Sequence, residues 1–349
     1  MNITKKATVE GIARVLIGKQ RSLLKPIYSK MHTSSSLDVQ DEADEVQIPM
    51  PWGHVSGKWW NSKDVRPVLC IHGWQDNAGT FDRLIPSLPK HLSYLAIDLP
   101  GHGLSSWYPH GMQYQPIDYI NVINLIRKEY GWEKVSLIAH SMGSIVGFNY
   151  CGLYPDRVDF MVGIDALKSH IKNKERVAPV LEYCYDNLLI ADERNRSKSE
   201  PPSYSYEETV KKLCEATNGS VTPETCKHIL QRNLRKSEKY PNKYYFARDN
   251  RLKYSGFINL AQEVSIEFAK RMQMPYLFIK ASKSPYYEKK EYFDQMIEAM
   301  RESNKNFEWH FIEGTHHLHL TSPETISELL SNFINKARPC GTDDAKSKL

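Results

Sequence analysis

The segment Ala139-His140-Ser141-Met142-Gly143 has the pattern of a serine nucleophile at a sharp turn between a strand and a helix. Small residues on both sides let the backbone turn sharply, so that the serine hydroxyl projects from the sheet towards a substrate. Alanine occupies the first position, where glycine is usual, and is small enough to be tolerated there. We therefore predict that Ser141 is a nucleophile. The alternative is a surface serine on an ordinary strand–helix loop.

A serine nucleophile needs a base, and three histidines occur within four residues of one another near the C-terminal end: His316, His317 and His319. Residue type alone does not show which of the three histidines is the base. Such a cluster could also bind a metal ion, but a zinc site would need further Asp, Glu or Cys ligands, which this stretch lacks. We therefore expect no metal site and no cofactor.

The donors that stabilise an oxyanion are expected in the loop Ile71-His72-Gly73-Trp74. Backbone N–H groups of Trp74 and Met142 are predicted to point at the oxyanion of a tetrahedral intermediate. The order of the two segments along the chain, with the His-Gly loop before the serine turn, supports this interpretation. The Trp74 indole could instead only form part of a pocket wall.

These residues need a scaffold, and from Val46 onward the chain alternates short apolar runs with amphipathic stretches. This pattern is typical of an α/β protein with a mostly parallel sheet covered by helices on both faces. Eight strands are predicted, at 46–50, 54–60, 67–71, 92–98, 135–139, 158–165, 276–281 and 307–313. Helices are predicted at 80–88, 116–130, 142–154, 289–303 and 323–336.

The interval 167–270 breaks this alternation and indicates helices joined by loops. An insertion of this size after the sixth strand is a candidate cap over a site at the C-terminal edge of the sheet. The predicted organisation is an N-terminal extension over 1–45, a core over 46–166 and 271–337, a helical cap over 167–270, and a flexible tail over 338–349.

Composition excludes several classes of protein. The 349 residues are 41% hydrophobic and 25% charged, enough for a sizeable core, and their longest apolar runs are far shorter than the ~20 residues of a membrane span. Residues 1–36 hold seven basic side chains and one acidic one, which leaves the rest of the chain nearly neutral and argues against a nucleic-acid-binding surface. The six cysteines form no CxxC pair, which favours reduced thiols in an intracellular compartment.

The two ends of the chain carry competing targeting signals. The N-terminal segment resembles a mitochondrial transit peptide, although a disordered basic tail, or a start at Met31 that removes it, fits equally well. The chain ends in Ser347-Lys348-Leu349, which is the signal read by the peroxisomal import receptor. We expect a peroxisomal location, with the cytoplasm or mitochondrion as alternatives.

These segments together resemble the α/β-hydrolase fold and, within it, the serine hydrolase-like proteins of animals, the Kraken type. The resemblance rests on His72-Gly73-Trp74-Gln75-Asp76-Asn77, the segment from Asp98 to Ser105, the Ser141 turn, the His316 loop, the segment Ala247–Phe257 and the SKL terminus. It implies that His316, seven residues before Pro323, is the base. It also disfavours haloalkane dehalogenases and epoxide hydrolases, which need an aspartate where Ser141 stands.

The acid of the triad departs from the common family pattern, because Ser284 occupies the place where an aspartate usually follows the seventh strand. Some relatives carry the acid at the end of the sixth strand, ten residues after a proline. Counting from Pro155 gives Asp165. The resemblance thus implies Asp165 as the acid that orients His316, with Glu288 as a second candidate and a purely structural aspartate as the alternative.

The expected function is a serine hydrolase that acts on carboxylic esters or related small acyl substrates through an acyl-enzyme. Two alternatives stay open: a hydrolase-fold binding or scaffold protein with weak turnover, and a peroxisomal acyl-CoA thioesterase. The predicted cap holds 19 Lys or Arg against 14 Asp or Glu between residues 168 and 270, which could attract an anionic acyl group. A solvated helical surface explains the same count.

Overall fold

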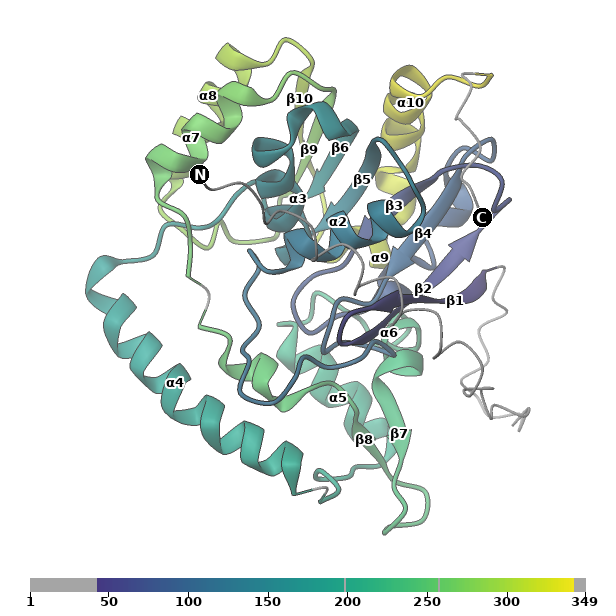
Figure 1. Cartoon of the computed structure of the whole chain (residues 1–349), viewed down its shortest axis with the longest axis vertical. Coiled ribbons are helices and arrows are strands. Elements are labelled where there is room, and N and C mark those ends of the chain that lie inside the picture. Colours follow the sequence, from purple (N-terminus) through teal and green to yellow (C-terminus); the bar gives the residue numbers. More distant parts are fainter. Residues whose placement is uncertain (1–42, 198, 257, 342–349) are drawn as a thin grey trace, which may run out of the picture. The chain divides into compact units, whose positions relative to one another are not determined.

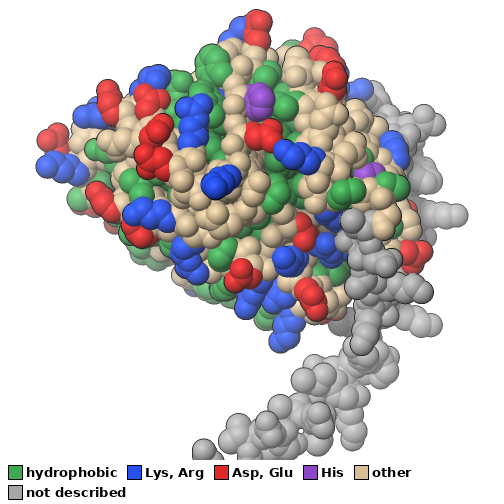
Figure 2. All heavy atoms as spheres, turned by 90° about the horizontal axis from the view of Figure 1, so that it is seen from above, with side chains coloured by type: hydrophobic (Ala, Val, Ile, Leu, Met, Phe, Trp, Pro, Cys, Tyr) green, Lys and Arg blue, Asp and Glu red, His purple; other side chains and the backbone are tan. Residues whose placement is uncertain are grey.

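The structure, a computed structural model, describes residues 43–341 apart from 198 and 257. The basic N-terminal segment with Met31 and the terminal Ser347-Lys348-Leu349 lie outside the described residues. No helix in the described part of the chain is both long and apolar enough to cross a membrane. On the face shown in Figure 2, basic and acidic side chains lie interspersed.

An eight-stranded sheet forms the centre of the described chain, in the order β1-β2-β4-β3-β5-β6-β9-β10 (Figure 1). The first two strands pair antiparallel with each other, β2 pairs antiparallel with β4, and all later neighbours are parallel. The sheet is therefore mostly parallel, as predicted. The strands are β1 (Asp44–Met50), β2 (Gly53–Trp60), β3 (Pro67–Ile71), β4 (Ser93–Ile97), β5 (Val135–His140), β6 (Val158–Ile164), β9 (Tyr276–Ala281) and β10 (Phe307–Ile312).

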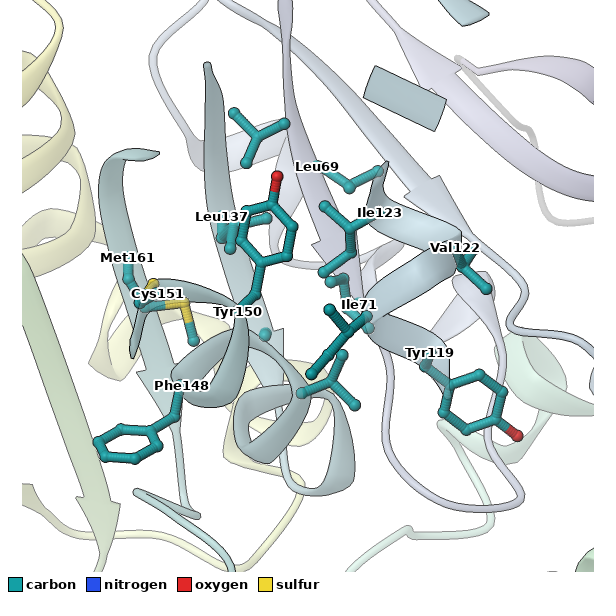
Figure 3. Close-up of a cluster of buried hydrophobic side chains, with 14 of the residues drawn as sticks. Leu69, Ile71, Tyr119, Val122, Ile123, Leu137, Phe148, Tyr150, Cys151 and Met161 are labelled. Carbon is teal, nitrogen blue, oxygen red and sulfur yellow. The ribbon is translucent and has the colours of Figure 1, made fainter. Parts of the chain in front are cut away.

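Alternating side chains of the central strands build two separate apolar cores, one on each face of the sheet. Leu69 and Ile71 of β3 point into one core, whereas Val68 and Cys70 point into the other. This follows from the two-residue period of a strand buried on both faces. Figure 3 shows the first core, where Leu69, Ile71, Leu137 and Met161 of three strands lie beside side chains from α2 (Tyr119–Glu129) and α3 (Met142–Leu153).

Helices α7 (Gln262–Arg271) and α8 (Lys290–Ser303) also contribute to the first core, and α10 (Ser327–Ala337) covers the second. Two predicted helices are shorter than expected. The stretch predicted at 80–88 consists of two 3₁₀ turns, Ala78–Phe81 and Ile85–Ser87, with Pro86 in the second. The last helix is divided into a 3₁₀ turn at Pro323–Thr325 and α10. A proline lacks the N–H needed to continue a helix from the preceding turn.

The segment between β6 and β9 contains α4 (Lys174–Arg196), α5 (Tyr206–Ala216), α6 (Cys226–Asn233) and, last, α7. It also contains a small antiparallel sheet of β7 (Leu234–Lys236) and β8 (Tyr244–Phe246), which the sequence did not lead us to expect. The predicted cap boundary at residue 270 falls inside α7, and α7 packs in the core layer against α3 and α8. We use "cap" below for residues 167–261.

Candidate active site

Ser141 lies at the turn between β5 and α3, with a φ of 53° and a ψ of −120°. A residue with a side chain adopts this region only at a cost of order 1–3 kcal/mol, and such strain is common at functional sites. The turn is tight because β3 runs beside it: a β-carbon on Gly143 would lie 2.3 Å from the carbonyl oxygen of Ile71. Only glycine fits there, which explains the second small residue of the predicted pattern.

The loop after β10 brings His316 to Ser141. The Nε2 atom of His316 lies 2.9 Å from Ser141 Oγ, within the distance at which a neutral imidazole accepts the hydroxyl proton. The two other histidines of the predicted cluster do not contact Ser141 Oγ: His317 Nδ1 lies 2.7 Å from Ser220 Oγ, and His319 Nε2 lies 2.8 Å from Thr80 Oγ1. Of the three, the structure therefore pairs His316 with the serine.

Asp165 directly follows β6 and completes this arrangement. Its Oδ2 atom lies 2.5 Å from His316 Nδ1, so a proton on Nδ1 is donated to the carboxylate and Nε2 is left free to accept from the serine. The other carboxylate oxygen, Oδ1, accepts hydrogen bonds from the Ala281 N–H at 2.9 Å and from Lys280 Nζ at 2.8 Å. Asp165 is buried, so these donors hold it in one orientation.

Ser284, at the usual position of the acid, and Glu288, the second candidate, are placed differently. Ser284 does lie beside the histidine, as the family pattern indicated, but its Oγ is 3.4 Å from His316 Nδ1. Glu288 forms a buried ion pair with Lys168 at 2.6 Å and accepts from the Ile171 N–H at 2.8 Å. Of the two predicted acids, Asp165 is therefore the one whose carboxylate reaches His316.

Two buried histidines fix the loop that carries Trp74. His72 Nδ1 donates to the Gly73 carbonyl oxygen at 2.7 Å, and its Nε2 accepts from the Leu99 N–H at 2.9 Å. His102 Nε2 accepts from the Gln75 N–H at 3.1 Å. Burial lowers the pKa of His72 to about 4, which keeps the ring neutral and able to accept at Nε2. The segment after β4 therefore positions the predicted oxyanion loop.

Trp74 and Met142 both line the cavity that contains Ser141. Met142 is the first residue of α3, and the N–H groups of a first helical turn have no acceptor within the helix and point out of its end. The Trp74 indole Nε1 donates to the Leu252 carbonyl oxygen of the cap at 2.9 Å. The oxyanion role of the two backbone N–H groups stays a prediction.

Comparison with known proteins agrees with this geometry. Residues 66–323 match the family model described as the alpha/beta hydrolase fold. The chain belongs to the α/β-hydrolase family. Within it, the chain is similar to a probable serine hydrolase of Drosophila melanogaster, with 36% identity over 85% of this chain and 89% of the relative. It is also similar to a serine hydrolase-like protein of Mus musculus, with 30% identity over 83% of this chain and 95% of that protein.

The fold is also similar to that of solved structures. A hypothetical protein from Pseudomonas aeruginosa PAO1 superposes with a TM-score of 0.70 at 26% identity, covering 84% of this chain and 98% of that one. The fold and the serine hydrolase-like family are thus established for this α/β-hydrolase.

A cavity of about 840 Å³ lies over Ser141 and His316 in this α/β-hydrolase. Its far walls come from the cap and include Tyr204, Leu213 and Arg248. A volume of this size suits a small-molecule ligand. The cap thereby encloses the serine on the side away from the sheet.

Several residues of this site were not predicted from the sequence. Lys280 is the second-to-last residue of β9 and looks like an ordinary strand residue in the sequence, and its contact with Asp165 depends on β6 and β9 being neighbours. Asp76 lies among the histidines that the sequence appeared to leave without an acidic partner: its Oδ2 is 3.8 Å from His317 Nε2 and 3.9 Å from His140 Nδ1. A carboxylate from a distant segment therefore lies beside the histidine cluster, although the stretch that carries His316, His317 and His319 contains none.

Proposed function

We propose that this protein is a serine esterase that cleaves carboxylic esters or related small acyl substrates through an acyl-enzyme. The observation that carries the proposal is the continuous chain from Ser141 Oγ through both ring nitrogens of His316 to Asp165, with distances of 2.9 Å and 2.5 Å. The main argument for a binding protein without turnover was that Ser284 replaces the usual acid. The Asp165 carboxylate beside His316 removes this argument.

In the proposed reaction, Ser141 Oγ attacks the acyl carbon while His316 Nε2 takes the hydroxyl proton. Asp165 holds the ring with its Nδ1 protonated and stabilises the imidazolium that forms. His316 then gives the proton to the leaving oxygen, so that the alcohol departs and the acyl group stays on Ser141. A water molecule, deprotonated by the same nitrogen, releases the acid and restores the serine.

The experiment that tests this proposal is hydrolysis of p-nitrophenyl esters of increasing acyl length by the wild-type protein and by Ser141→Ala. We expect saturable turnover in the wild type and only the uncatalysed background in the variant, with unchanged thermal unfolding. Equal turnover by a well-folded Ser141→Ala protein would exclude the proposal.

A second candidate, an acyl substrate with an anionic group, is favoured by Arg248 on the cap wall of the cavity. Its Nε atom is buried, and within the described residues its guanidinium has no hydrogen bond or ion pair. Burial lowers the pKa of Arg248 to about 10, and burial together with Arg248 and Arg194 lowers the pKa of the nearby Lys253. An anionic group of the substrate would satisfy these cations.

Hemisuccinate esters and acyl-CoA thioesters, compared with neutral esters of equal chain length, test this candidate. We expect Arg248→Gln to lower the ratio of kcat/KM for anionic over neutral substrates about tenfold, because a hydrogen bond to a charged group contributes about 1.5–3 kcal/mol. Lys212→Gln, which removes a cation lining the same cavity, is the matched comparison. If Arg248→Gln left the ratio of kcat/KM for anionic over neutral substrates unchanged, the anionic-substrate candidate would be excluded and only neutral esters would remain.

A further inference from the structure

Next to the proposed triad lies a second group of titratable side chains that the mechanism does not use. Asp76, His140 and His317 are all buried and come from three different segments of the chain. One ligand atom from each, Asp76 Oδ2, His140 Nδ1 and His317 Nε2, lies within 4.8 Å of the other two. The same residues form part of the cavity wall around Ser141.

The hydrogen bonds of His140 determine which of its nitrogens carries the proton. Its Nε2 atom lies 2.9 Å from the carbonyl oxygen of His316. A carbonyl oxygen only accepts, so Nε2 carries the proton and donates it. In the neutral ring, Nδ1 is then left with a lone pair, and this buried atom has no hydrogen-bond partner within the described residues.

The same reasoning applies to His317. Ser220 Oγ donates its proton to the Thr217 carbonyl oxygen at 2.7 Å, so it is an acceptor for His317 Nδ1, which lies 2.7 Å away. The proton of a neutral His317 is therefore on Nδ1. Its Nε2 carries a lone pair directed towards Asp76 Oδ2, which is 3.8 Å away.

Three possible metal-ligand atoms therefore face one another in a buried space. Asp76 Oδ2 has no hydrogen-bond donor within the described residues, and distances of 3.8–3.9 Å to the two nitrogens are too long for direct hydrogen bonds. A buried carboxylate beside two imidazole lone pairs is costly unless a proton or a cation lies between them.

We propose that Asp76, His140 and His317 form a binding site for a divalent transition-metal ion such as Zn²⁺. Two imidazoles and one carboxylate are a donor set that suits Zn²⁺ and its first-row neighbours, whereas Mg²⁺ and Ca²⁺ prefer oxygen ligands. Tetrahedral zinc with ligands at about 2.0–2.1 Å places ligand atoms about 3.4 Å apart, so the three atoms, which lie within 4.8 Å of one another, need to approach by about 1.4 Å at most.

The surroundings of both histidines match those of metal ligands. A metal-bound imidazole usually donates its other N–H to a carbonyl, a carboxylate or a hydroxyl, which fixes the ring and its tautomer. His140 and His317 already do so, to the His316 carbonyl oxygen and to Ser220 Oγ. Gly73 leaves room beside the site, since a β-carbon there would lie 3.1 Å from His140 Nδ1.

An ion at this site would act on the neighbouring base. The ring centre of His316 lies 4.7 Å from that of His140 and 5.2 Å from that of His317. A divalent cation so close disfavours the positive charge that His316 would gain as it accepts the serine proton. The bound ion is therefore an inhibitor of the proposed reaction, and chelation restores turnover.

Isothermal titration of Zn²⁺ into the chelator-treated, full-length protein without a polyhistidine tag tests the site independently of activity. We expect one tightly bound ion per chain in the wild type, and loss of that binding in both Asp76→Asn and His317→Gln. His110→Gln is the matched control, because His110 also faces an aspartate, Asp192 at 3.0 Å, but on an exposed side chain. It should bind zinc as the wild type does.

Two further measurements show whether a loss of zinc binding comes from loss of the proposed ligands. Circular dichroism shows whether each variant is folded, and His317→Gln alone suffices if Asp76→Asn does not fold. Co²⁺ in place of Zn²⁺ should give the visible absorption of a tetrahedral site with nitrogen and oxygen ligands. Three results would each overturn the proposal. The first is absence of stoichiometric binding, and the second is binding that survives in a folded His317→Gln. The third is the charge-transfer bands of thiolate ligation at Cys214 and Cys226, whose sulfurs lie 3.5 Å apart.

Discussion

Two groups of histidine and aspartate lie side by side in this α/β-hydrolase, and their hydrogen bonding differs. In the first, every donor meets an acceptor: Ser141 donates to His316, His316 donates to Asp165, and Lys280 donates to the same carboxylate. In the second, Asp76, His140 and His317 bring three possible metal-ligand atoms within 4.8 Å of one another, and two of these atoms have no hydrogen-bond partner within the described residues.

The difference lies in the donors that each group receives from its own scaffold. The first group is linked by hydrogen bonds throughout, whereas in the second the described residues give Asp76 Oδ2 and His140 Nδ1 no hydrogen-bond partner. Residue types by themselves do not reveal this difference, because both groups contain histidine and aspartate. The tautomers fixed by neighbouring backbone and hydroxyl groups do reveal it.

The strongest test of the separation between the two groups is His316→Gln. We expect kcat for ester hydrolysis to fall by about 10⁶-fold, the size of loss seen when a serine-protease base is removed. Zinc binding should persist, because the hydrogen bond between His316 and the second group is made by the His316 backbone oxygen. Steady-state kinetics and calorimetry on the same preparation measure both effects. Loss of zinc binding in the folded variant would show that the groups are not separate.

Asp165→Asn should give the next largest effect, a fall in kcat of about 10⁴-fold, because an amide favours the wrong tautomer of the histidine. Ester kinetics at constant pH provide the measurement. A fall in kcat of less than about tenfold would show that another group acts as the acid. Glu288→Gln is the control, because the Glu288 carboxylate pairs with Lys168.

Lys280→Met should mainly affect stability. Removing one partner of a buried ion pair costs about 3–5 kcal/mol, since the remaining charge stays buried, and Lys280 and Asp165 are both buried. Urea unfolding measures the change. We expect kcat to fall much less than in Asp165→Asn, because the Ala281 N–H still donates to the carboxylate. An unchanged free energy of unfolding would show that Lys280 does not stabilise the acid.

Ser284→Ala should have the smallest effect. The contact of Ser284 Oγ with His316 Nδ1 is 3.4 Å, compared with 2.5 Å for Asp165, and a single hydrogen bond of a neutral group contributes about 0.5–1.5 kcal/mol. We expect kcat/KM to fall by less than about tenfold. A loss as large as that of Asp165→Asn would indicate that Ser284 takes part in orienting the base.

Much of the core was predictable because strand and helix periodicities are local. All eight strands of the main sheet were expected close to their observed positions, since a short apolar run can be recognised without the rest of the chain. The family pattern pointed to His316 and Asp165 before any geometry was available, and the structure places both beside Ser141. Their catalytic roles remain for the experiments above to decide.

What could not be predicted depends on contacts between distant segments. Lys280 meets Asp165 only because β6 and β9 pair, although more than a hundred residues separate the two strands. Asp76 joins His140 and His317 only when the loops after β3 and β10 meet the end of β5 at one edge of the sheet. The short hairpin of β7 and β8 was missed because each strand has only three residues, too few for a periodic pattern.

Labelling with a fluorophosphonate probe, read out by intact mass, tests most directly whether Ser141 is an activated nucleophile, because it needs no knowledge of the natural substrate. We expect one probe per wild-type chain, located at Ser141 by peptide mapping, no labelling of Ser141→Ala, and much slower labelling of Asp165→Asn. A folded wild-type protein that stays unlabelled while it hydrolyses small esters, or a label that persists in Ser141→Ala, would contradict the assignment of Ser141, His316 and Asp165 as a working triad.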